Sequence, residues 1–258
     1  MLLVVIGGCG TRARPVQTLL GRWLMQYPLL IAHRGGDANW PEGSMFAYTR
    51  AAEWNASLAL EVPMWQTSDG VWVVSHDPTT GRVFGVDHRI EATLWRVLAS
   101  LRSLKGNEPM ARAEDVLARF DGGSRILFVE DKSGRHIPSF LGLLNGHPGR
   151  TRYVVKCYWS QWAVADAAHR RGYRTWGYYY TKDMSEFATT QRHFDLLGLS
   201  YQATAADFAQ MHATGKRVIA HVIRTRPQAS QALAKGADGL MVSGVVDNVP
   251  RGPSGTSP

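Results

Sequence analysis

The chain contains few cysteines and no long apolar run. Cys9 and Cys157 are its two cysteines, which gives little reason to expect a disulfide framework. No apolar stretch is long enough to cross a bilayer. Residues 1–9 look like the end of a lipoprotein signal, but they lack a basic segment and their apolar run is too short for a signal peptide. We therefore expect a cytoplasmic protein without stable membrane insertion.

Acidic residues are fewer than basic ones. The chain has 29 Lys and Arg against 21 Asp and Glu, which gives a formal net charge of +8. A basic balance favours anionic partners. However, the basic residues are scattered, and no basic run is interleaved with aromatic side chains as in a nucleic-acid groove. We therefore expect no nucleic-acid partner.

Strand-like apolar runs alternate with helix-like segments along most of the chain. Eight runs predict strands at residues 29–33, 58–62, 125–130, 153–158, 174–180, 196–199, 217–223 and 239–242. The segments between them predict helices at residues 44–54, 113–119, 138–144, 161–171, 185–193, 204–213 and 228–235. Ser44, Ser185 and Thr204 are the expected N-caps of three helices. This alternation favours a parallel sheet, either closed into a (β/α)8 barrel or left open.

The pattern predicts one α/β domain with additions. We assign residues 29–250 to the domain, 1–28 to an N-terminal extension with a helix near 15–25, and 251–258 to a flexible Gly/Pro/Ser-rich tail. Residues 64–112 are longer than a normal crossover and predict an insertion. Within it, the Asp69-Gly70 turn precedes a hairpin-like strand at 71–75, and a helical piece follows near 91–101.

Polar residues gather where several of these strands end. The first strand ends in His33-Arg34-Gly35, and Pro41-Glu42 then opens a helix. The second strand carries Glu61, and the hairpin strand is followed by His76-Asp77. Glu130-Asp131-Lys132 ends the next strand of the domain. Charged groups on buried strands need strong partners, so this concentration requires an explanation beyond folding.

These motifs resemble those of the glycerophosphodiester phosphodiesterase family. The family pattern reads HRG, PEN-T, E-x-D, T-x-DG-x-x-V-x-HD and E-x-K, and the tail GADGLMVSG at 236–244 looks like its G-x-DG ending. The resemblance extends from residue 29 to residue 250. It implies a (β/α)8 TIM barrel with an inserted segment after strand 2. It also implies hydrolysis of small-molecule glycerophosphodiesters to sn-glycerol 3-phosphate and an alcohol.

The resemblance also implies roles for two histidines and two basic residues. His33 and His76 would form the acid/base pair, because a histidine titrates near working pH and both would face the barrel mouth. Arg34 and Lys132 would bind the phosphate and stabilise the charge that grows on its oxygens. An ion pair between Lys132 and a neighbouring carboxylate is compatible with that role.

Glu61 and Glu130 are the expected ligands of a divalent cation, Mg²⁺ or Ca²⁺, because clustered carboxylates suit these ions. Glu42 would support the site by orienting its groups or by helping the ion without binding it firmly. The family's E-x-D lacks its aspartate here, because Pro63 stands in its place. Three outcomes stay open: a weakly bound ion, with water or Asp131 completing its shell; catalysis without a metal; or a site retained for binding. Weak-metal or metal-light catalysis ranks first, because both histidines and both basic groups are present.

Two rival functions stay open at this point. Related barrels expel the headgroup by an intramolecular hydroxyl attack, a phospholipase D-like reaction that gives a cyclic phosphate. Alternatively, the barrel binds phosphodiesters without turnover, as the loss at Pro63 suggests. The sequence leaves the headgroup and the oligomeric state open. Trp40 and Trp65 are the tryptophans best placed to line a headgroup.

Overall fold

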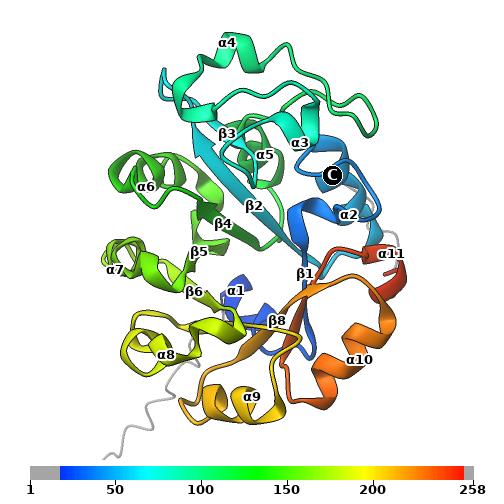
Figure 1. The fold of residues 1–258 in the computed structure, drawn as a ribbon, viewed down its shortest axis with the longest axis vertical. Helices are drawn as coiled ribbons and strands as arrows, with labels where there is room; N and C mark the ends of the chain where they lie inside the picture. Colours follow the sequence, from blue (N-terminus) through cyan, green and yellow to red (C-terminus); the bar gives the residue numbers. More distant parts are fainter. Residues whose placement is uncertain (1–17, 253–258) are drawn as a thin grey trace, which may run out of the picture.

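The computed structural model describes residues 18–252, and their strands form a closed barrel (Figure 1). Each of the eight barrel strands runs parallel to its neighbours, and β1 pairs with both β9 and β2, which closes the ring. A ninth strand, β3, is antiparallel to the end of β2. The strands are β1 Leu29–Ala32, β2 Ala59–Gln66, β3 Trp72–Val74, β4 Leu127–Asp131, β5 Tyr153–Tyr158, β6 Arg174–Tyr179, β7 Leu196–Ser200, β8 Val218–Ile223 and β9 Gly239–Val242.

Helices surround this barrel, and Figure 1 shows α6 to α10 following one another around the strands. The helices are α1 Leu19–Trp23, α2 Met45–Trp54, α3 Gly81–Phe84, α4 Trp95–Leu98, α5 Ala113–Phe120, α6 Ile137–Asn145, α7 Trp162–His169, α8 Met184–Thr190, α9 Ala205–His212, α10 Arg226–Ala234 and α11 Val245–Asn248. Among the described residues, no helix is long and apolar enough to cross a membrane. The closed ring of eight parallel strands with helices around it confirms the predicted (β/α)8 barrel.

All eight predicted barrel strands are present, and most end within two residues of the predicted boundary. The exception is β2, which continues through Pro63 to Gln66 because its last residues pair with β3. Ser44 and Thr204 are N-caps, as expected, and each accepts a hydrogen bond from a backbone N–H three residues later. The expected N-cap at Ser185 is wrong. A 3₁₀ turn, Thr181–Asp183, leads directly into α8, so this helix begins at Met184 and Ser185 lies in its first turn.

Two apolar layers hold the barrel together. The outer layer lies between strands and helices and is the larger. The inner layer fills the barrel, where Phe128 and Trp176 pack edge to face with centroids 5.5 Å apart. Helix α1 joins this layer through Trp23, whose ring lies 5.7 Å from that of Phe128. Gly198 leaves room for Trp176, since a Cβ there would come within 2.5 Å of the indole. The described end of the N-terminal extension therefore packs with the barrel's inner core.

The predicted insertion has a small apolar cluster of its own. It contains β3, α3 and α4, and it occupies the top of Figure 1 beside β2. Seven buried side chains form the cluster: Trp65, Val73, Phe84, Ile90, Leu98, Leu101 and Met110. Because this cluster packs on the hairpin of β2 and β3, it fixes the loop that follows β3. That loop carries His76 and Asp77.

Candidate active site

His33 begins a tight turn at the carboxyl end of β1. The turn is a 3₁₀ segment, His33–Gly35, in which Arg34 and Gly35 have φ values of 50° and 79°. A β-carbon at Gly35 would lie 3.0 Å from the Ala47 Cβ, so the turn packs closely on α2. The Arg34 N–H donates to Glu61 Oε2 at 2.9 Å. This bond ties the first strand's exit to the middle of β2.

His33 has carboxylates near both ring nitrogens. Its Nδ1 lies 2.9 Å from Asp37 Oδ1, and its Nε2 lies 3.9 Å from Glu61 Oε2. Asp37 also accepts a hydrogen bond from the Ser243 hydroxyl at 2.6 Å. Burial would raise the pKa of Asp37, but the hydrogen bond and charge of His33 lower it to about 2. An ionised carboxylate only accepts, so Nδ1 carries a proton and donates to Asp37.

His76 has a similar partner and a different setting. Its Nδ1 lies 2.7 Å from Asp77 Oδ1, and Asp77 also pairs with Arg82. The hydrogen bond from His76 is the main cause that lowers the pKa of Asp77. Burial lowers the pKa of His76, and the charges of Lys132 and Arg34 lower it further, which outweighs Asp77. His76 is therefore neutral at neutral pH, with Nδ1–H donated to Asp77 and Nε2 free to accept a proton.

Glu42 orients Arg34 instead of facing open solvent. Arg34 Nη1 donates to Glu42 Oε1 at 3.0 Å, and Arg82 donates to both oxygens of Glu42 at 2.7 Å. Arg34 Nε is buried and has no hydrogen-bond partner within residues 18–252. Because a buried N–H without a partner is costly, this donor is suited to an anion that enters the site.

Arg34, Pro63 and His76 border one small cavity. Its volume is about 10 Å³, roughly the space of one water molecule. Glu42, Gly43, Val74, Ser75, Val83 and Phe84 complete its walls. The cavity therefore brings together the exit of β1, the middle of β2 and the loop after β3. Trp65 is buried, and its Nε1 donates to the His76 carbonyl at 3.2 Å.

Glu61 and Glu130 meet at one buried cation, and that cation is a lysine. Lys156, in the middle of β5, places Nζ 2.9 Å from Glu61 Oε1 and also bonds to Glu130 Oε2. Glu130 Oε1 accepts from Lys132 Nζ at 3.2 Å and from the Tyr178 hydroxyl at 2.9 Å. All five groups lie on β2, β4, β5 and β6 or directly after β4, so adjacent strands of the barrel build the cluster.

The ionisation of this cluster follows from its charges. Burial would raise the pKa of Glu61, but Lys156, His33 and Arg34 hold it well below its ordinary value. Burial would also raise the pKa of Glu130, but the charges of Lys132 and Lys156 lower it below its ordinary value. Burial would lower the pKa of Lys156, but the two glutamates raise it. Both carboxylates and the ammonium are therefore charged.

These residues do not fit a divalent cation. Mg²⁺ and Ca²⁺ bind through carboxylate oxygens, but each oxygen of Glu61 and Glu130 already accepts from a protein donor, and the Lys156 ammonium lies between the two carboxylates. Pro63 offers no side-chain oxygen. Within residues 18–252, no group of three or more His, Cys, Asp or Glu residues is arranged to hold a metal ion. Asp131 does not complete such a set, because its carboxylate accepts from the backbone N–H groups of Ser133 and His136.

An aromatic wall stands beside the cluster. Tyr178 packs against Tyr158 and His221, with ring centroids 5.3 and 5.6 Å apart. The Tyr180 ring also packs on His221, with centroids 5.3 Å apart, and the residue is 45% exposed. Burial, with a smaller effect of Lys156, lowers the pKa of His221 to about 3, so this imidazole is neutral. The wall therefore supplies apolar surface and no third proton carrier.

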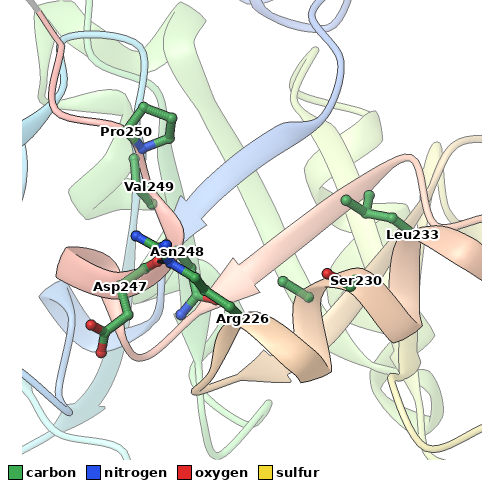
Figure 2. A pocket seen from close by; sticks show the side chains of 8 residues that line it. Arg226, Ser230, Leu233, Asp247, Asn248, Val249 and Pro250 are labelled. Carbon is green, nitrogen blue, oxygen red and sulfur yellow. Dashed lines mark hydrogen bonds between the residues drawn. The ribbon is translucent and has the colours of Figure 1, made fainter.

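A wider pocket lies away from these groups. It has a volume of about 400 Å³ and lies between α10 and α11, where Arg226, Ser230, Asp247 and Asn248 are among its lining residues (Figure 2). None of the predicted site residues contributes to it. Its chemistry offers no acid/base pair, so the strand-end cluster is the candidate active site.

Comparison with known proteins agrees with the motifs. Residues 33–133 match the model of the glycerophosphoryl diester phosphodiesterase family. This segment belongs to that family. The match contains His33, His76 and Lys132, and with it the family predicted from the sequence is confirmed. The enzyme class that follows from the family is that of a phosphoric diester hydrolase.

Solved structures share the barrel. A putative glycerophosphoryl diester phosphodiesterase of Agrobacterium tumefaciens is 18% identical, with a TM-score of 0.73 over 83% of this chain and 92% of that one. An Oleispira antarctica phosphodiesterase, in complex with its product sn-glycerol-3-phosphate, is 17% identical, with a TM-score of 0.74 over 84% and 94%. A glycerophosphodiester phosphodiesterase of Thermotoga maritima is also 17% identical, with a TM-score of 0.66 over 85% and 96%. At these identities the likeness establishes the fold.

Sequence reasoning missed four residues of this glycerophosphodiesterase-like site. Asp37 and Tyr178 carried no signal, because a loop aspartate and a strand tyrosine are common. Asp77 stood beside His76 in a recognised motif and was not given a role. Lys156 did carry a signal: it is a charged residue in the otherwise apolar run YVVKCY, and such a charge needs a partner when it is buried.

Proposed function

We propose that this chain hydrolyses glycerophosphodiesters to sn-glycerol 3-phosphate and an alcohol. The main support is that His33 and His76 each contact an aspartate through Nδ1. In addition, Arg34 and His76 line the same small cavity. The family match over residues 33–133 supports this choice of reaction.

The two histidines have different tasks in this proposal. Water attacks the phosphorus and gives a proton to Nε2 of neutral His76. The bond from phosphorus to the alcohol oxygen breaks, and Nε2 of His33 donates a proton to that oxygen. Asp77 holds the neutral His76 ring in its Nδ1–H tautomer, and Asp37 accepts from Nδ1–H of the doubly protonated His33 ring that acts as the acid. The Glu61 carboxylate lies 3.9 Å from His33 Nε2 and stabilises the proton on that nitrogen.

Arg34 and Lys132 stabilise the phosphate charge. The Arg34 Nε has no partner among the described residues, and its Nη1 is held by Glu42. Lys132 lies after β4, at the carboxyl end where barrel enzymes place their chemistry. Fixed positive charge at oxygens that become more negative is among the largest contributions to catalysis.

The test is release of glycerol 3-phosphate from glycerophosphocholine and glycerophosphoethanolamine. We expect turnover by the unaltered chain and its loss in His33→Ala and His76→Ala. His147→Ala is the matched control, because His147 also contacts an aspartate through Nδ1, at 2.7 Å, but precedes β5 at the opposite end of the barrel.

Phosphorus NMR of the products decides between the rival reactions. A linear phosphomonoester supports hydrolysis, whereas a cyclic phosphate means that a substrate hydroxyl replaces water as nucleophile. Binding of both substrates without any product would contradict the proposal and identify a phosphodiester-binding barrel.

A further inference from the structure

Lys156 occupies the space between two buried carboxylates. Its side chain is 6% exposed, and those of Glu61 and Glu130 are 1% exposed. The ammonium also lies 4.2 Å from the centroid of the Tyr178 ring and 5.7 Å from that of Trp176. Two carboxylates and two ring faces surround it, so the group is held as a fixed internal cation.

The four carboxylate oxygens of this pair already have donors. Glu61 Oε1 accepts from Lys156, and Glu61 Oε2 accepts from the Arg34 N–H. Glu130 Oε2 accepts from Lys156, and Glu130 Oε1 accepts from Lys132 and the Tyr178 hydroxyl. Two negative charges thus face two ammonium groups. A divalent ion between the carboxylates would have to displace the Lys156 ammonium or lie against it.

The strand pairing shows why no third acid helps an ion. Pro63 follows Glu61 by two residues, which places both on the same face of β2, and it pairs directly with Glu130 of β4. A carboxylate at this position would join the other two, but proline supplies neither a ligand nor an N–H. The missing carboxylate at Pro63 and the additional ammonium of Lys156 therefore lie in the same cluster.

We propose that Lys156 is the resident cation of this site, and that it positions Glu61 and Glu130 in place of a divalent metal ion. Glu61 then holds the backbone of Arg34, and Glu130 holds Lys132, so both phosphate-binding groups depend on Lys156. The consequence for catalysis rests on the proposed function: turnover proceeds without a divalent cation. The consequence for binding does not depend on it.

The binding test uses Mn²⁺ alone, with free Mn²⁺ followed by electron paramagnetic resonance on the metal-stripped full chain. We expect no stoichiometric site in the unaltered protein, weak binding at most in Pro63→Asp, and a clear gain in Pro63→Asp/Lys156→Gln. In the double variant, adding Glu130→Gln should remove the gained site.

Stoichiometric binding by the unaltered chain that Glu61→Gln abolishes would overturn the proposal. This arm needs no variant beyond Glu61→Gln, so it stands even if the double variant fails to fold.

The activity test separates the two proposals. We expect turnover of the unaltered chain to survive EDTA, Lys156→Gln to lower kcat by at least tenfold with little change in KM, and Lys156→Arg to recover part of the loss. A merely structural role for Lys156 would lower the amount of folded enzyme and leave kcat per folded molecule unchanged.

Absence of turnover together with absence of Mn²⁺ binding would reject the phosphodiesterase and leave Lys156 as the resident cation. Turnover that needs an added ion would reject the role of Lys156 and leave the phosphodiesterase.

Discussion

Lys132 and Lys156 contact the same carboxylate, and their pKa values move in opposite directions. Burial lowers the pKa of Lys132, and Glu130 compensates only in part. Lys156 is also buried, but Glu130 and Glu61 together raise its pKa. Lys132 follows the end of β4, whereas Lys156 lies within β5. Lys132 pairs with one carboxylate, and its ammonium can face a substrate. Lys156 pairs with two carboxylates, and its ammonium is held inside the cluster.

Loss of Lys156 should have the largest effect on stability. Lys156→Met leaves two buried carboxylates without their shared cation, which costs about 3–5 kcal/mol when one partner of a buried pair is removed. Urea unfolding measures this loss. Lys182→Met, at an exposed lysine, is the control and should change stability by less than about 0.5 kcal/mol. An unchanged midpoint in Lys156→Met would show that the ion pair does not carry the cluster.

Loss of Lys132 should affect turnover more than stability. Lys132→Met removes a fixed charge near the phosphate, and we expect kcat/KM to fall by about 10²- to 10³-fold. The loss of stability should be smaller than for Lys156→Met, because Glu130 keeps Lys156 and Tyr178 as donors. Steady-state kinetics beside urea unfolding of both variants makes the comparison. Equal effects of the two lysines on both quantities would contradict the division of roles.

Tyr178 tests the cluster more gently. Tyr178→Phe removes the hydroxyl that donates to Glu130 and keeps the ring beside Lys156, so we expect a loss of about 2 kcal/mol, typical of a hydrogen bond to a charged group. Tyr180→Phe is the control, since Tyr180 is 45% exposed and the side-chain donors to Glu130 among the described residues are Lys132, Lys156 and Tyr178. Thermal unfolding of both variants measures the difference, and a larger loss in Tyr180→Phe would count against the assignment.

The smallest expected effect is a shift in pH dependence. His76 must be neutral to accept a proton, so kcat/KM falls as the pH drops through its pKa, which burial and Lys132 hold below the ordinary value of 6.5. Lys132→Met should move this acid limb to higher pH, and Asp77→Asn should move it to lower pH, because Asp77 raises the pKa of His76. A limb that stays fixed in both variants would mean that another group titrates.

The barrel could be predicted because apolar runs of strand length carry their own signal. β5 and β9 have the predicted boundaries, since turn residues flank both runs. The short helix α3 was not predicted, because four residues carry no periodicity. The ends of β1 and β4 located His33 and Lys132, since parallel strands present their carboxyl ends at one face.

The partners of these residues could not be predicted. The contact of Lys156 with Glu61 and Glu130 depends on the register of β2, β4 and β5, which the sequence of one strand does not contain. The assignment of a metal to Glu61 and Glu130 stays a prediction, and the ammonium between them argues against it. The boundaries at residues 28 and 250 also stay predictions. Residues 1–17 and 253–258, with most of the predicted tail, lie outside the described part.

The most direct measurement is glycerol 3-phosphate release by the metal-stripped chain in EDTA, with Mn²⁺, Mg²⁺ or Ca²⁺ then added back in excess. The account predicts turnover that is present in EDTA, does not rise with any of the three ions, and disappears in His76→Ala. Turnover that is absent in EDTA and returns with one ion would contradict it.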